Sequence, residues 1–135
     1  MRQALAWVGA SELEHRFLGE LSGGQRQKVY LAMALAQDTR TILMDEPTTY
    51  LDVSAQLEVM ILARRLAEEG RSIVMVLHDL CQALRFADRA VLLEGGRIRQ
   101  AGTPEELYAG DVLRQVMGVD LGRVELPEGP RYFYR

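Results

Sequence analysis

The chain has 135 residues, of which 48% are hydrophobic and 26% charged, a balance that favours a packed globular protein and excludes a disordered one. Its formal net charge is -3, so no overall basic field would attract a nucleic acid. No apolar stretch approaches the roughly 20 residues that cross a bilayer, and the single cysteine, Cys81, excludes an intrachain disulfide. These features predict a soluble, cytoplasmic protein with no nucleic-acid partner and no direct membrane insertion.

The first third of the chain predicts three helices, over 2–8, 11–18 and 23–37. Ser11 and Glu14 have the spacing of a capping box for the second helix. Ser22 is placed to cap the third, although two glycines follow it at once. Apolar residues at helical spacing give the third helix one buried face: Val29, Ala32, Met33 and Ala36.

The middle of the chain predicts strands that alternate with helices: a strand over 41–44, a helix over 54–69, a strand over 72–77 and a helix capped by Asp79. Gly70 ends the first of these helices. The first strand is a short apolar run that ends in two acids, as a buried strand does when its carboxyl end carries chemistry. The alternating order implies a parallel sheet flanked by helices.

The C-terminal part predicts a hairpin and two short helices. Strands over 90–94 and 97–101 flank two glycines that can form a tight antiparallel turn. Thr103 caps the next helix, with Glu106 in the capping-box position, and a further helix covers 111–117. The tail, 119–135, is expected to form irregular strands.

Asp45 and Glu46 are the first candidates for chemistry. Successive side chains diverge at the end of a strand, so one acid could face a metal ion while the other orients a water molecule. Taken alone, the two carboxylates could equally be a solvated strand edge or a helix N-cap. A lone His78 would more simply be a hydrogen-bonded core histidine, but it directly follows the second strand.

Three segments together resemble the ATPases of the ATP-binding cassette (ABC) family: LSGGQRQK at 21–28, DEPTTYLD at 45–52 and His78. They resemble the family's signature, its Walker B segment with the following D-loop, and its switch histidine. The resemblance implies an α/β fold of the P-loop NTPase (ABC ATPase) type, here partial. A parallel sheet core flanked by helices would be followed by the small antiparallel hairpin.

The resemblance also implies a role for each site residue, with ATP and Mg²⁺ as cofactors. Glu46 would be the catalytic carboxylate, His78 the contact to the γ-phosphate, and Asp45 the acid associated with Mg²⁺. Asp52 would link two subunits across a dimer. The signature would bind the nucleotide of a second ATPase subunit in a head-to-tail dimer through Ser22, Gly23, Gly24 and Gln25.

The signature has a physical reason for its glycines. A helix that begins at residue 23 presents free backbone N–H groups and the positive end of its dipole to a phosphate. Glycine lacks the Cβ that would block the approach.

The phosphate-binding loop GxxxxGK[ST] (Walker A) is missing from these residues. Lys28 is the only lysine, and Val29 follows it, so no such loop exists in the chain. The Q-loop glutamine is absent as well. The chain by itself is therefore expected neither to bind ATP tightly nor to turn it over, and to expose apolar strand edges that favour marginal stability or association.

We divide the chain by motif into a helical signature portion over 1–38, an α/β core with Walker B, D-loop and switch histidine over 39–118, and a tail over 119–135. Within the family, TTYLD, HDL, EGGRIRQAGTPEEL and VMGVDL resemble importer ATPases for iron–siderophore, haem or cobalamin uptake. Tyr50, where the broad family has a small residue, is shared with that branch.

An importer ATPase implies membrane permease subunits as partners and a cytoplasmic position at the inner face of the cell membrane, held there through the permease. Two alternatives stay open: a non-transport ABC ATPase of DNA repair or chromosome organisation, and a truncated, non-enzymatic half-subunit. Sustained heptads, zinc-ligand cysteines and basic patches, which usually accompany the former, are absent. No residue encodes the transported ligand.

Overall fold

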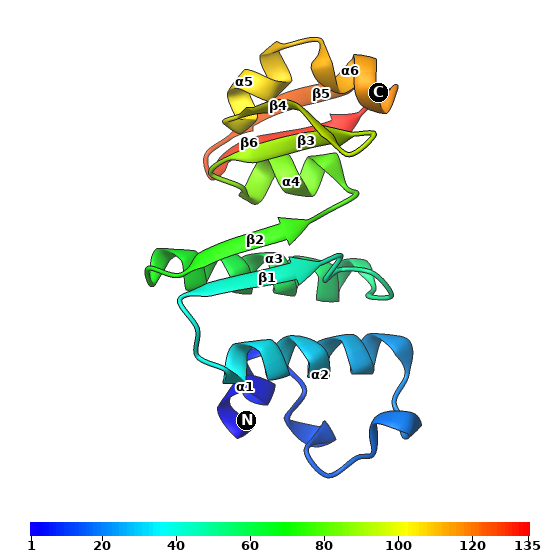
Figure 1. The fold of residues 1–135 in the computed structure, drawn as a ribbon, viewed down its shortest axis with the longest axis vertical. Coiled ribbons are helices and arrows are strands. Elements are labelled where there is room, and N and C mark those ends of the chain that lie inside the picture. Colours follow the sequence, from blue (N-terminus) through cyan, green and yellow to red (C-terminus); the bar gives the residue numbers. More distant parts are fainter. The chain divides into compact units, whose positions relative to one another are not determined.

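The computed structural model describes residues 1–135, which form two compact units, Met1–His78 and Asp79–Arg135 (Figure 1). The boundary falls directly after the predicted switch histidine. No helix is both long enough and apolar enough to cross a membrane. The division proposed from the sequence, at residues 38 and 118, separates motifs rather than compact units. It stays a prediction.

The first unit begins with helix α1, Arg2–Trp7, as predicted. The helix predicted over 11–18 is wrong, because the structure has only two 3-10 turns there, η1 at Ser11–Leu13 and η2 at Leu18–Glu20. Ser11 makes no capping bond. The expected partner, Glu14, instead has its carboxylate 2.5 Å from Arg2, so the capping box cannot close.

Helix α2, Gly23–Ala36, begins at the predicted Ser22 cap. Its buried face differs from the predicted one, because Met33 is 47% exposed and Ala36 lies at the surface. The structure instead buries Val29, Leu31, Ala32 and Leu35. The second half of this helix is apolar nearly all round, so residue spacing alone does not select the face.

Strands β1, Thr41–Asp45, and β2, Ser72–Val76, pair in parallel, as the alternating order predicted. Helix α3, Val53–Glu68, connects them, and Gly70 follows it in the left-handed region at φ 92°. One face of the strand pair packs into a core shared with α1, α2 and α3 (Figure 1).

The other face of β1 and β2 is open, with Leu43 at 73%, Val74 at 55% and Val76 at 50% exposure. Parallel sheets are normally covered on both faces. An uncovered apolar face supports the expectation of marginal stability or association, which stays a prediction.

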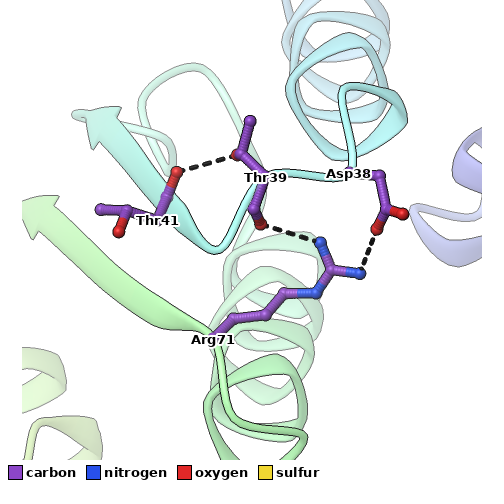
Figure 2. Close-up of polar contacts among 4 residues, drawn as sticks. All are labelled: Asp38, Thr39, Thr41 and Arg71. Atoms are coloured by element: carbon purple, nitrogen blue, oxygen red, sulfur yellow. Dashed lines mark hydrogen bonds and ion pairs between the residues drawn. The ribbon is translucent and has the colours of Figure 1, made fainter.

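At the opposite end of the strands from the two acids, Arg71 ties the loop after α2 to the start of β2 (Figure 2). Its guanidinium lies 2.6 Å from the carboxylate of Asp38 and donates to the backbone carbonyl of Thr39 at 3.1 Å. The hydroxyl of Thr39 in turn donates to the carbonyl of Thr41 at 2.8 Å. These bonds connect the segment before β1 to the residue before β2.

Replacing Leu35 by Ala should destabilise the first unit by about 2–5 kcal/mol, because its side chain is only 2% exposed and the truncation leaves a cavity in the core. Urea unfolding followed by the fluorescence of Trp7, the only tryptophan, measures the loss in this unit. Leu57→Ala, at a site 37% exposed on α3, is the matched control. Equal unfolding midpoints for both variants would contradict the described core.

The second unit contains α4, Leu80–Phe86; β3, Ala90–Glu94; β4, Arg97–Gly102; α5, Pro104–Ala109; and α6, Val112–Met117. The predicted hairpin is confirmed, with Gly95 and Gly96 at φ 55° and 74°. The predicted caps are confirmed as well: Asp79 accepts backbone N–H groups at the start of α4, and Thr103 forms its capping box with Glu106.

The tail forms strands, as expected, but the expectation that they are irregular is wrong, because β5, Leu121–Leu126, and β6, Gly129–Tyr134, form a regular antiparallel hairpin. Gly129 accepts φ 103° at the turn. Tyr132 is buried in the core of this unit, and the hydroxyl of Tyr134 accepts the backbone N–H of Leu80 at 3.2 Å. The aromatic residues of the last strand thereby order the tail.

Candidate functional site

The site lies where β1 and β2 end. Because the strands are parallel and Asp45 pairs with Val76, the residues that follow each strand emerge at the same edge of the sheet. Glu46 donates its backbone N–H to the carbonyl of Val76 at 3.1 Å and then turns away at φ 47°. A positive φ is uncommon for a residue with a Cβ and often occurs at functional sites.

Glu46 and His78 meet at this edge. His78 Nε2 lies 2.7 Å from Glu46 Oε1, and the two side chains are 76% and 41% exposed. The hydroxyl of Thr49 donates to the other carboxylate oxygen at 3.2 Å. The two residues selected from separate motifs are therefore brought together, with both oxygens of the carboxylate engaged.

This environment stabilises the ionised form of the Glu46 carboxyl. The hydrogen bond from His78 is the largest cause that lowers the pKa of Glu46 below its ordinary 4.5; partial burial opposes it, and the charge of His78 and the Thr49 hydroxyl add to the lowering. A lowered pKa in the folded chain means that the pairing contributes to stability above about pH 4.5 and loses that contribution as the pH falls through the lowered pKa.

The signature opens α2 with a closed capping box. Gln25 donates its backbone N–H to the hydroxyl of Ser22 at 3.3 Å, and its side-chain oxygen accepts the N–H of Ser22 at 3.0 Å. Ser22 therefore holds the helix start, and Gln25 does so through its side chain. The backbone N–H groups of Gly23 and Gly24 remain as donors in the first turn, which is where an anion would bind.

The signature glycines also pack against the D-loop of the same chain. A Cβ at Gly24 would lie 3.1 Å from the backbone oxygen of Tyr50 and 3.6 Å from a methyl of Leu51. One at Gly23 would lie 3.5 Å from Tyr50 Cβ. Tyr50 itself is at φ 65° with its side chain 80% exposed. Gly24 thus permits a close approach within the chain, in addition to any phosphate contact.

Asp45 and Asp52 flank this region. Asp52 is the N-cap of α3, where its carboxylate accepts the backbone N–H of Ala55 at 2.9 Å. Asp45 ends β1 with an exposed side chain. No group of three metal-ligating side chains forms in the chain, and a single exposed carboxylate suits Mg²⁺, which takes most of its ligands from phosphates and water. The metal role of Asp45 and the dimer link through Asp52 stay predictions.

Residue patterns did not single out Thr49 or the packing of Tyr50 against the signature. Thr49 reaches Glu46 because the chain turns back at Glu46, where its backbone N–H also bonds the carbonyl of that residue at 3.1 Å. The sequence signal for this contact was the position of Thr49, a hydroxyl residue three positions after Glu46 with Pro47 between them. The distance between Gly24 and Tyr50 is a tertiary contact that spacing does not encode.

Three comparisons place the chain among known proteins. A family model described as ABC transporter matches residues 1–49. The iron(3+)-hydroxamate import ATP-binding protein of Bacillus subtilis (strain 168) is 46% identical over 132 residues, which are 97% of this chain and 48% of that protein. The chain spans about half the length of the curated relatives it matches.

Two solved structures share the fold. An inward-facing structure described as a metal-chelate type ABC transporter matches with a TM-score of 0.83 and 26% identity, over 99% of this chain and 55% of that one. A dimeric ATP-binding cassette bound to ADP and phosphate matches with a TM-score of 0.67 and 36% identity, over 76% of this chain and 44% of that one.

In its fold, its motifs and these matches, the chain is similar to part of the ATP-binding domain of ABC transporters. It is similar in particular to ATP-binding proteins whose names describe the import of iron–hydroxamate and hemin. The predicted P-loop NTPase fold is confirmed for the part of that fold that this chain covers.

Proposed function

We propose that the chain is part of the ATP-hydrolysing subunit of an ABC importer for an iron–siderophore or related metal chelate. The observation that carries this proposal is the meeting of Glu46 and His78 at the ends of two parallel strands, 2.7 Å apart. The similarity to chelate-import ATP-binding proteins supports the substrate class. ATP and Mg²⁺ would supply the transferable phosphoryl group and its charge neutralisation.

Each site residue then has its own role in ATP hydrolysis. The ionised carboxylate of Glu46 accepts a proton from the attacking water as a general base. His78 would donate its Nε2–H to a phosphate oxygen, and Asp45 would be the carboxylate that helps to hold Mg²⁺, which would neutralise phosphate charge. Gly23 and Gly24 offer their N–H groups to the phosphate of a nucleotide held by a second subunit. The phosphate cradle itself has to come from a GxxxxGK[ST] segment that these residues lack.

The proposal includes a head-to-tail dimer of ATPase subunits, permease subunits that hold the dimer at the inner face of the membrane, and a cytoplasmic location. A relative in dimeric form supports the pairing. The isolated 135-residue chain is proposed to be inactive, because it has the signature, the base and the histidine without the cradle.

A hybrid protein tests this function. It joins the chain to the phosphate-loop half of an ABC ATPase, for example by replacing the 132 residues that the chain matches in the hydroxamate-import relative. We expect Mg²⁺-dependent release of phosphate from ATP. A folded hybrid that binds ATP and releases no phosphate would contradict the proposed function.

A further inference from the structure

The two oxygens of the Glu46 carboxylate are held by donors of unequal rigidity. His78 reaches Oε1 at 2.7 Å through a side chain that is 76% exposed and so has little packing around it. Thr49 reaches Oε2 at 3.2 Å through a partly buried hydroxyl on a β-branched side chain, which is stiff at χ1. The threonine is therefore the more constrained of the two partners.

The backbone fixes this threonine relative to the carboxylate. Thr49 donates its N–H to the carbonyl of Glu46 at 3.1 Å, while Glu46 donates its own N–H to Val76 at 3.1 Å. Pro47, which lies between Glu46 and Thr49 in the sequence, is buried. The turn is thus anchored to β2 at one end and closed on itself at the other, and the hydroxyl has a defined place over the carboxylate.

His78 cannot serve two acceptors at full strength with a single N–H. Nε2 carries at most one hydrogen, and in this structure it is directed at Glu46. If the same nitrogen turns to a phosphate, the carboxylate loses that partner. The Thr49 hydroxyl is then the remaining side-chain contact that orients Glu46.

We propose that Thr49 is a positioning residue, whose hydroxyl keeps the Glu46 carboxylate oriented towards water when His78 leaves it for the nucleotide. This inference rests on the proposed function, in which Glu46 is the base. The simpler role for Thr49 is to close the turn through its backbone N–H alone. That role makes the hydroxyl dispensable, so the two roles predict different results for an isosteric variant.

The first test uses the 135-residue chain and nuclear magnetic resonance. To remove the competing contact of His78, three-bond couplings are compared in a His78→Ala background. They should report one χ1 rotamer of Glu46 in His78→Ala, averaged rotamers when Thr49→Val is added, and one rotamer again when Thr49→Ser, which keeps the hydroxyl, is added instead. Thr48→Val is the matched control, because the hydroxyl of Thr48 makes no hydrogen bond to Glu46. Couplings in His78→Ala that do not change when Thr49→Val is added, with amide spectra otherwise alike, would overturn the proposal.

The second test uses the hybrid protein and separates kcat from KM. Thr49→Val should lower kcat roughly five-fold, as expected for the loss of one hydrogen bond that orients the base, leave KM for ATP unchanged, and be rescued by Thr49→Ser. An active wild-type hybrid whose kcat is the same in Thr49→Val would overturn the positioning role alone. An inactive wild-type hybrid would contradict the proposed function, and the couplings in the isolated chain would then decide the role of Thr49.

Discussion

Replacing Glu46 by Gln is expected to lower the rate of phosphate release by the hybrid protein about 10²- to 10⁴-fold, the usual contribution of a general base. Glutamine keeps the shape of the side chain, and its single carbonyl oxygen can still accept the hydrogen bond from His78 while its NH2 group donates to the Thr49 hydroxyl, but it cannot take a proton from water. Steady-state release at saturating MgATP measures the effect, and KM for ATP should change little.

The matched control for this substitution is Glu69→Gln, an exposed acid at the end of α3. It should keep the wild-type rate. Near-wild-type release by Glu46→Gln would show that another group activates the water, and it would remove the base role from this site.

Replacing Gly24 by Asp is expected to lower the rate by about 10²-fold, comparable to the loss of a donor that stabilises transition-state charge. A Cβ there would lie 3.1 Å from the Tyr50 carbonyl oxygen, so the D-loop has to shift. The added carboxylate would also repel a phosphate at the helix start. Gly19→Asp is the control, since a Cβ at Gly19 meets nothing within 4 Å.

A mixing experiment shows whether the signature acts on the partner subunit. In a head-to-tail dimer, a Gly24→Asp subunit paired with a Glu46→Gln subunit retains one site in which both residues are wild type. Mixing the two inactive hybrids should therefore recover part of the activity. No recovery, with mixed dimers present, would show that the signature acts within its own subunit.

Local signals in the sequence predicted most elements of this chain. The caps at Ser22, Asp79 and Thr103 and the glycine turn of the β3–β4 hairpin depend on neighbouring residues, and each is confirmed. The helix predicted over 11–18 failed because Arg2, twelve positions before Glu14, takes the carboxylate that a capping box would use. Strands were expected in the tail, but their regular pairing as the β5–β6 hairpin was not, because Tyr132 is ordered by tertiary packing, which the sequence of a short tail does not reveal.

The site likewise contains residues that the sequence predicted and residues that it did not. Glu46 and His78 were identified as candidates in separate motifs, and parallel pairing of the strands that precede them explains why they meet. The contacts made by Thr49 and Tyr50 depend on positive φ values at Glu46 and Tyr50. Few residues with side chains adopt such values, and the sequence does not predict them. Only the structure therefore shows the contacts that Thr49 and Tyr50 make in the site.

The most direct test of the central claim compares MgATP hydrolysis by the 135-residue chain with hydrolysis by the hybrid protein at equal concentrations. The chain has the signature, Glu46 and His78 but no phosphate-binding loop, so we expect no release above the blank from the chain and steady release from the hybrid. Magnesium-dependent release by the chain alone, abolished by Glu46→Gln, would contradict the claim that its site is completed by a phosphate cradle from elsewhere.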